Sequence, residues 1–236
     1  MPHEGAQSAS FAVPPEMLAF ETIAVAPVGS GGELLLAHRG DEWVVRVDGK
    51  ILMSSLMHDS EESLAQEAID RVKNPQAVLV GGLGLGFTLR AVLDRVSASA
   101  KVTVGELVPE LVDWNRLHLA ELHDHALDDP RCEVVVGNVF DVIKRSRAAF
   151  DVILLDVDNG PIALSQAANQ QIYSERGLRH CHTALREGGI LAVWSAGPSP
   201  RFQQRLVGAG FEVEVLRVEA RKGNRARHVL FLATRR

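Results

Sequence analysis

The segment from residue 76 to residue 106 constrains the fold of this 236-residue chain more than any other. It reads QAVLVGGLGLGFTLRAVLDRVSASAKVTVGE, which is an apolar run, a glycine-rich loop, a helical stretch and a second apolar run. Strands that are apolar throughout are buried on both faces, as in a parallel sheet covered by helices. The segment therefore predicts two parallel strands joined by a crossover helix.

The loop between the first strand and the helix carries glycines spaced G-x-G-x-G. Its glycines allow backbone to approach a ligand closely, and the helix that follows directs its N–H groups there. A dinucleotide site has G-x-G-x-x-G, whereas here Phe87 occupies the last position. Glu106 ends the second strand, where a carboxylate accepts hydrogen bonds from ribose hydroxyls. We therefore predict a nucleoside site without a pyrophosphate, formed by Glu106 and by Gly81, Gly82, Gly84 and Gly86.

The alternation of apolar strands and helices continues beyond this unit, with apolar runs CEVVVG, FDVILLD and GGILAVWS separated by helical stretches. The last two runs, FEVEVLRVEA and RHVLFLAT, lie too close for a crossover helix, so we expect a hairpin with one antiparallel strand. The predicted fold class is α/β, a doubly wound, mostly parallel seven-stranded sheet of the class I methyltransferase type. With the glycine spacing, this layout predicts a cofactor of the S-adenosylmethionine type.

Three regions are expected along the chain. Residues 1–18 form a loose N-terminal leader. Residues 19–57 contain short β-type runs separated by turns, which predict a small antiparallel β-hairpin subdomain. Residues 58–236 form the methyltransferase-like nucleoside-binding domain.

Asn138 and Val139 follow the third parallel strand, at the same sheet edge as the glycine loop. The Asn138 amide can bind the adenine ring, and it can equally cap the next helix. Both roles stay open on the sequence alone.

An acidic loop, DVDNGP, follows the fourth strand. An alkylamine must lose its proton before it can act as a nucleophile, and its free pKa is about 10. Asp156, aided by Asp158, could bind such an amine and accept its proton. The alternative is that Asp156 caps the loop and that residues 158–160 form a turn.

The net charge of −5 and the pI near 6.0 argue against a general nucleic-acid binder. No apolar run reaches the roughly 18 residues that cross a bilayer, and residues 1–15 lack the features of a signal peptide. We therefore expect a cytoplasmic protein with neither membrane nor nucleic-acid partners.

Several segments resemble the spermidine synthase family of polyamine aminopropyltransferases: VDGKIL, SEESLAQEA, VLVGGLG, LDDPRCEVVVGN, FDVILLD and ALREGGILAV. The resemblance implies a small β domain before a methyltransferase-like domain, and a homodimer. It implies transfer of an aminopropyl group from decarboxylated S-adenosylmethionine to a diamine. Carried over by position, Glu106 binds ribose, Asn138 stands at the adenine-recognition position, and Asp156 is the catalytic aspartate.

The resemblance departs from the family pattern around the amines. The family's glycine-loop aspartate is Gly84 here, and the second aspartate of its D-S-x-D-P motif falls on Asn159. Its Tyr-His pair falls on Ala65-Gln66, and the glutamine of its second N-terminal strand falls near Leu52-Met53. The nucleoside half of the pattern is kept, while much of the diamine half is changed.

Two further residues are candidates for substrate binding together with Asn159. His58, together with Glu61 and Glu62, lies where a loop could fold over the cofactor, and the alternative for His58 is the entry to a helix. Tyr173 begins a later helix, where an aromatic side chain could line the substrate cleft. For His118, His123 and His125 we expect a solvated helix end, and we expect no metal site. Trp194 is expected in the core or the pocket wall, and Ser195 could face the pocket.

Three functions remain open. The first is aminopropyl transfer to an amine acceptor, with Asp156 as base. The second is a methyltransferase that uses S-adenosylmethionine on an unknown acceptor. The third is a non-catalytic protein that binds a nucleoside.

Overall fold

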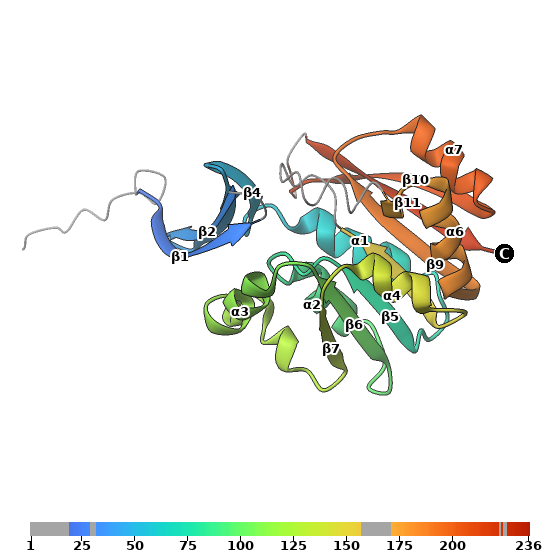
Figure 1. Ribbon diagram of the computed structural model, residues 1–236, viewed down its shortest axis with the longest axis horizontal. Helices are drawn as coiled ribbons and strands as arrows, with labels where there is room; N and C mark the ends of the chain where they lie inside the picture. Colours follow the sequence, from blue (N-terminus) through green and yellow to red (C-terminus); the bar gives the residue numbers. More distant parts are fainter. Residues whose placement is uncertain (1–18, 29–31, 157–170, 222, 224–225) are drawn as a thin grey trace, which may run out of the picture.

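The computed structural model describes residues 19–28, 32–156, 171–221, 223 and 226–236, so the predicted leader lies outside the described part. Two sheets account for its strands (Figure 1). The smaller sheet is antiparallel in the order β1-β2-β3-β4, with strands Glu21–Val28, Gly32–Arg39, Glu42–Val47 and Lys50–Ser54. It agrees with the expected hairpin region, while the boundary at residue 57 stays a prediction.

The larger sheet has seven strands in the order β10-β11-β9-β8-β5-β6-β7. Strands β9, β8, β5, β6 and β7 run parallel to one another. Strand β11 runs antiparallel to β9 and forms a hairpin with β10. The predicted fold class is therefore confirmed. The strands are β5 Ala77–Gly81, β6 Lys101–Glu106, β7 Cys132–Val136, β8 Phe150–Leu155, β9 Leu185–Ser195, β10 Phe211–Glu219 and β11 Arg227–Arg235.

Helices cover both faces of this sheet, as the alternate residues of its central strand β5 show by entering two different apolar clusters. Val78 and Val80 of β5 join the cluster that contains α1 and α2, whereas Leu79 joins the cluster of α4, α6 and α7. Among the described residues, the helices are α1 Asp59–Ile69, α2 Phe87–Leu93, α3 Pro109–Leu117, α4 Val139–Arg145, α6 Glu175–Ala184 and α7 Pro200–Gly208. Short 3-10 turns span Ala120–His123 and Ala126–Asp128.

The small sheet is attached to the larger domain by a third apolar cluster. Leu34, Leu36 and Val45 of the small sheet pack with Leu111 and Trp114 of α3. The small sheet therefore lies beside the ends of β5 and β6, and β4 can contribute to a site at that edge (Figure 1).

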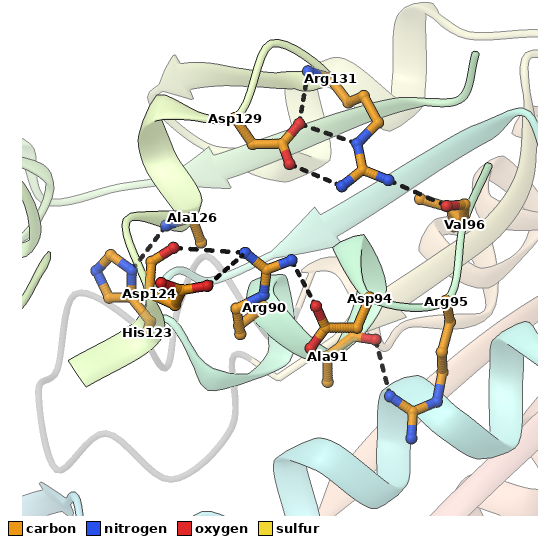
Figure 2. A network of polar contacts seen from close by, with 10 residues as sticks. All are labelled: Arg90, Ala91, Asp94, Arg95, Val96, His123, Asp124, Ala126, Asp129 and Arg131. Atoms are coloured by element: carbon orange, nitrogen blue, oxygen red, sulfur yellow. Dashed lines mark hydrogen bonds and ion pairs between the residues drawn. The ribbon is translucent and has the colours of Figure 1, made fainter. Parts of the chain in front are cut away.

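The LDDPR segment before β7 contains an ion pair, Asp129–Arg131, which we call the structural tie because it links β7 to the segment after α2. Asp129 Oδ1 accepts from Arg131 Nε at 2.9 Å, and Oδ2 accepts from Nη2 at 2.7 Å (Figure 2). Arg131 Nη1 also donates to the Val96 carbonyl at 3.0 Å, beyond the end of α2. Hydrogen bonds from Arg131 lower the pKa of Asp129 to about 2. The motif thus fixes the entry to β7 against α2.

Arg131→Lys should lower the melting temperature by about 3–6 °C. Lysine cannot form the two parallel hydrogen bonds, and a loss of about 1–2 kcal/mol corresponds to that shift in a domain of this size. Thermal unfolding measures the effect. Arg179→Lys is the control, because its pair with Glu175 is exposed and 3.8 Å long, and its melting temperature should change by less than about 1 °C. Equal shifts in the two variants would contradict a structural role for the tie.

Candidate active site

A cavity of about 440 Å³ opens at the edge of the large sheet where the parallel strands end. Its described wall comes from the glycine loop, the ends of β6, β8 and β9, the loop after β7, the first turn of α1, and β4. His228, near the start of the antiparallel β11, reaches the same edge. The cavity therefore lies where ligands bind in open α/β sheets.

Glu106 holds the nucleoside half of the cavity together. Its side chain is buried, Oε2 accepts the Leu83 N–H at 2.8 Å, and Oε1 accepts the Val108 N–H at 2.8 Å. Burial raises the pKa of Glu106, and these backbone N–H groups oppose the rise. Because a carboxylate oxygen accepts more than one hydrogen bond, the same group can also receive ribose hydroxyls.

Two glycines of the loop line the cavity. Gly82 has φ 92° and Gly84 has φ 54°, values that favour glycine. Asn115, buried on α3, donates from Nδ2 to the Gly84 carbonyl at 2.9 Å and to the Leu111 carbonyl at 2.8 Å. Asn115 thus fixes the glycine loop to α3, and the loop forms part of the cavity wall.

The other two predicted glycines, Gly81 and Gly86, lie outside the cavity wall and serve packing. A Cβ at Gly81 would lie 2.8 Å from Leu155 Cδ2. At Gly86, where φ is 87°, a Cβ would lie 2.5 Å from His123 Cδ2. These positions let β8 and the buried His123 approach the loop.

Asn138 shows one of its two expected roles directly. Its Oδ1 accepts the Phe140 N–H at 2.9 Å and caps α4. The residue also lines the cavity, as does Val139, so the amide nitrogen is the group that could donate to a nucleobase. Contact with adenine stays a prediction.

Two carboxylates lie beyond the nucleoside half. Asp156 directly follows β8, and Glu61 lies in the first turn of α1. Both line the cavity, and burial, followed by the charge of Asp156, raises the pKa of Glu61 to about 8. Asp158 and Asn159 fall outside the described residues.

A buried serine joins α1 to two strands beside these carboxylates. Ser60 Oγ accepts from Trp194 Nε1 at 3.1 Å and lies 3.0 Å from His228 Nδ1. Trp194 and His228 both line the cavity, so the pocket-wall alternative for Trp194 is confirmed. Sequence reasoning missed His228, and it placed Glu61 beside His58 near the cofactor without a role of its own. The return of β11 to this sheet edge is the signal that could have indicated His228.

The side of the cavity next to Gly84 is apolar. Met53 Sδ lies 3.6 Å from the place where a Gly84 Cβ would be. Leu52 and Met57 extend this surface. The glycine loop itself, residues 81–86, consists of glycine and leucine and carries no charged side chain.

Several predicted residues lie outside the described wall. His58 stacks on Phe87 with ring centroids 4.2 Å apart and contacts Glu62 at 2.8 Å. Tyr173, which precedes α6, packs edge-on against Phe202 in the core. Ser195 donates to the Gly197 carbonyl. Substrate binding by His58 and Tyr173 gains no support from the described geometry.

The three histidines after α3 do not behave alike. His118 and His125 are exposed, as expected for a solvated helix end. His123 is buried, and its Nδ1 accepts the Ala126 N–H at 3.1 Å (Figure 2). The expectation was wrong for His123, since the 3-10 turns fold it beneath the glycine loop.

One group could offer metal ligands. Ligand atoms of His58, Asp59 and Glu62 lie within 4.8 Å of one another at the start of α1. None of the three lines the cavity. In the described part of the chain, no helix combines the length and the apolar character needed to traverse a bilayer.

Gly86→Ala should be much more destabilising than Gly49→Ala. Both glycines have positive φ, but a Cβ at Gly49 would meet nothing within 4 Å, whereas one at Gly86 meets His123. Backbone strain alone costs about 1–2 kcal/mol, and the clash adds to it at Gly86. Chemical denaturation measures the free energy of unfolding. A Gly86→Ala loss no larger than the Gly49→Ala loss would contradict close packing there.

Glu61→Gln should change the pH dependence of stability. Because the pKa of Glu61 is raised from 4.5 to about 8, the folded protein binds more protons than the unfolded chain between these pH values. Its free energy of unfolding therefore falls as pH rises through this window. The variant should melt at least about 3 °C above wild type at pH 9, with a smaller difference at pH 5. Glu62→Gln, at the exposed neighbour, should keep the wild-type profile, and parallel profiles for Glu61→Gln and wild type would disprove the assignment.

Comparisons with known proteins agree on one family. The sequence model of the spermine/spermidine synthase domain matches residues 57–208. Polyamine aminopropyltransferase 2 of Pseudomonas aeruginosa is 37% identical over 158 residues, which is 64% of this chain and 42% of that protein. Polyamine aminopropyltransferase 1 of Hyperthermus butylicus is 34% identical over 175 residues, covering 72% of this chain and 58% of that protein.

Solved structures share the fold. Spermidine synthase in complex with the transition state analogue AdoDATO aligns with a TM-score of 0.75 and 22% identity, over 91% of this chain and 74% of that chain. Spermidine synthase from Thermotoga maritima aligns with a TM-score of 0.71 and 21% identity, over 91% and 72%. The chain spans only 42% and 58% of the two relatives named above. From the domain match, the chain belongs to the spermine/spermidine synthase family.

Proposed function

We propose that this protein is an aminopropyltransferase that moves an aminopropyl group from decarboxylated S-adenosylmethionine to a small amine. The observation that carries the proposal is that Asp156 shares one cavity with Glu106 and the glycine loop. Strands β8, β5 and β6 are adjacent, so an acceptor beside Asp156 lies next to a nucleoside bound at Glu106. The names of its relatives, polyamine aminopropyltransferases, support the same reaction.

Each described residue has a place in this reaction. Glu106 accepts the ribose hydroxyls, and Asn138 donates to the adenine ring. Gly82 and Gly84 allow the nucleoside to lie close to the backbone. These contacts fix the sulfonium beside the end of β8.

Asp156 acts on the acceptor. It accepts a proton from the ammonium, and the freed nitrogen lone pair attacks the carbon attached to the sulfonium. The C–N bond forms as the C–S bond breaks, and sulfur keeps the electron pair as a thioether. Asp158 and Asn159, which follow in the chain, are proposed to assist at the acceptor. The cytoplasmic location and the homodimer stay predictions.

One observation favours a second function. The described glycine loop carries no acidic side chain, and Met53 lies against Gly84. An aspartate at that position would repel the carboxylate of S-adenosylmethionine, so its absence is compatible with methyl transfer from the carboxylated form. The two donors must therefore be compared directly.

Chromatography should detect 5′-methylthioadenosine when decarboxylated S-adenosylmethionine and 1,4-diaminobutane are supplied. Asp156→Asn should lower kcat at least about 100-fold while donor affinity stays within about twofold, because the base is lost and the nucleoside contacts are not. Asp141→Asn, at an exposed pair with Lys144, is the control with wild-type activity.

Three results would count against the proposal. Methyl transfer from S-adenosylmethionine, with no aminopropyl product, would favour the second function. Full activity of Asp156→Asn would contradict the role of Asp156 as the base that deprotonates the acceptor. Nucleoside binding without turnover, for either donor and a panel of amines, would favour the non-catalytic binding protein.

A further inference from the structure

The cavity divides along the order of the strands. The ends of β5, β6 and β7 carry the glycine loop, Glu106 and Asn138. On the other side of β5 lie β8, β9 and β11, which bring Asp156, Trp194 and His228 to the same edge. The second half stands beyond the nucleoside, where the other substrate of a transfer reaction must enter.

Glu61 belongs to this second half because of the course of α1. The helix packs across β8, β9 and β11. Ser60, which is only 1% exposed, binds Trp194 and contacts His228, so the first turn of α1 is fixed to both strands. The Glu61 side chain, next in the chain, is thereby held in the cavity wall with Asp156.

The charges in the wall are unbalanced. Its described residues include the carboxylates Glu61, Asp156 and Glu106 but no lysine or arginine. Glu106 is bound to backbone N–H groups of the glycine loop and of α3's start, whereas Glu61 and Asp156 repel each other. Burial lowers the pKa of His228, which disfavours a positive charge on its ring. A cationic ligand that enters between Glu61 and Asp156 would reduce this repulsion, because an opposite charge nearby favours the charged form of a carboxyl group.

We propose that Glu61 is a second carboxylate for the acceptor, which binds the ammonium group of a primary alkylamine jointly with Asp156. The inference rests on the proposed aminopropyl transfer and deepens it. Before the amine binds, Glu61 holds a proton at pH 7, because its pKa is raised to about 8. The ammonium replaces that proton, which leaves to solvent, and Asp156 then accepts a second proton from the amine before the C–N bond forms.

Isothermal titration calorimetry tests this without turnover. 1,4-Diaminobutane is titrated at pH 7 into protein saturated with 5′-methylthioadenosine, in two buffers with different ionisation enthalpies. Wild-type protein should bind the amine and release close to one proton, because the pKa of Glu61 falls from about 8 when the cation arrives. Glu61→Gln should bind the amine at least about 10-fold more weakly and lose this proton release, while its affinity for 5′-methylthioadenosine stays within about twofold.

Two further variants sharpen the result. Glu62→Gln removes the neighbouring carboxylate, which lies outside the cavity wall, and should match wild type in amine affinity and proton release. Glu61→Asp keeps a carboxylate and should recover part of both effects, which a purely structural role of Glu61 would not predict. Proton release also shows whether a weaker amine affinity reflects lost charge or a disturbed fold.

The outcomes separate this inference from the proposed function. If wild-type protein does not bind the amine, or if Glu61→Gln keeps wild-type affinity and proton release, the role of Glu61 is overturned. If Glu61→Gln loses both while wild-type protein yields no 5′-methylthioadenosine from decarboxylated S-adenosylmethionine, the amine site stands and aminopropyl transfer fails.

Discussion

The site depends on the hydrogen bonds between the buried Glu106 carboxylate and two backbone N–H groups. One of its oxygens accepts from the Leu83 N–H in the glycine loop, and the other accepts from the Val108 N–H just before α3. The same carboxylate thus connects the glycine loop to the start of α3. Its burial raises its pKa, and the backbone donors oppose this rise. Asn115 reinforces the loop from α3, since it binds the Gly84 carbonyl. A ligand that supplies hydroxyl donors to Glu106 would complete an arrangement already built into the backbone.

Much of the fold was predictable because its strands are apolar throughout. Runs such as QAVLVGG and FDVILLD can be satisfied only by burial on both faces, and the short connection before β11 required a hairpin. The same logic placed Glu106, Asn138 and Asp156, because the carboxyl ends of neighbouring parallel strands meet at one edge. For Asn138 the sequence left two roles open; the structure shows the helix cap, and the adenine contact stays a prediction.

Residues whose position depends on long-range packing were not predictable. Gly81 and Gly86 look like ligand glycines in a one-dimensional pattern, yet each accommodates a neighbour from another element, Leu155 and His123. Glu61 and His228 are 167 positions apart and meet the same cavity only because α1 crosses the sheet and β11 returns antiparallel. Tyr173 carried a plausible signal as an aromatic near a helix start, but its ring packs in the core cluster that contains Phe202.

The most direct test of the account is the affinity of the wild-type protein for 5′-methylthioadenosine and for its 2′-deoxy analogue, measured by calorimetry. If Glu106 receives the ribose hydroxyls, the protein binds the first ligand, and removing one hydroxyl weakens binding about 10- to 100-fold, since a hydrogen bond to a charged group contributes about 1.5–3 kcal/mol. Equal affinity for the two ligands, or no binding of either, would contradict a nucleoside site at Glu106.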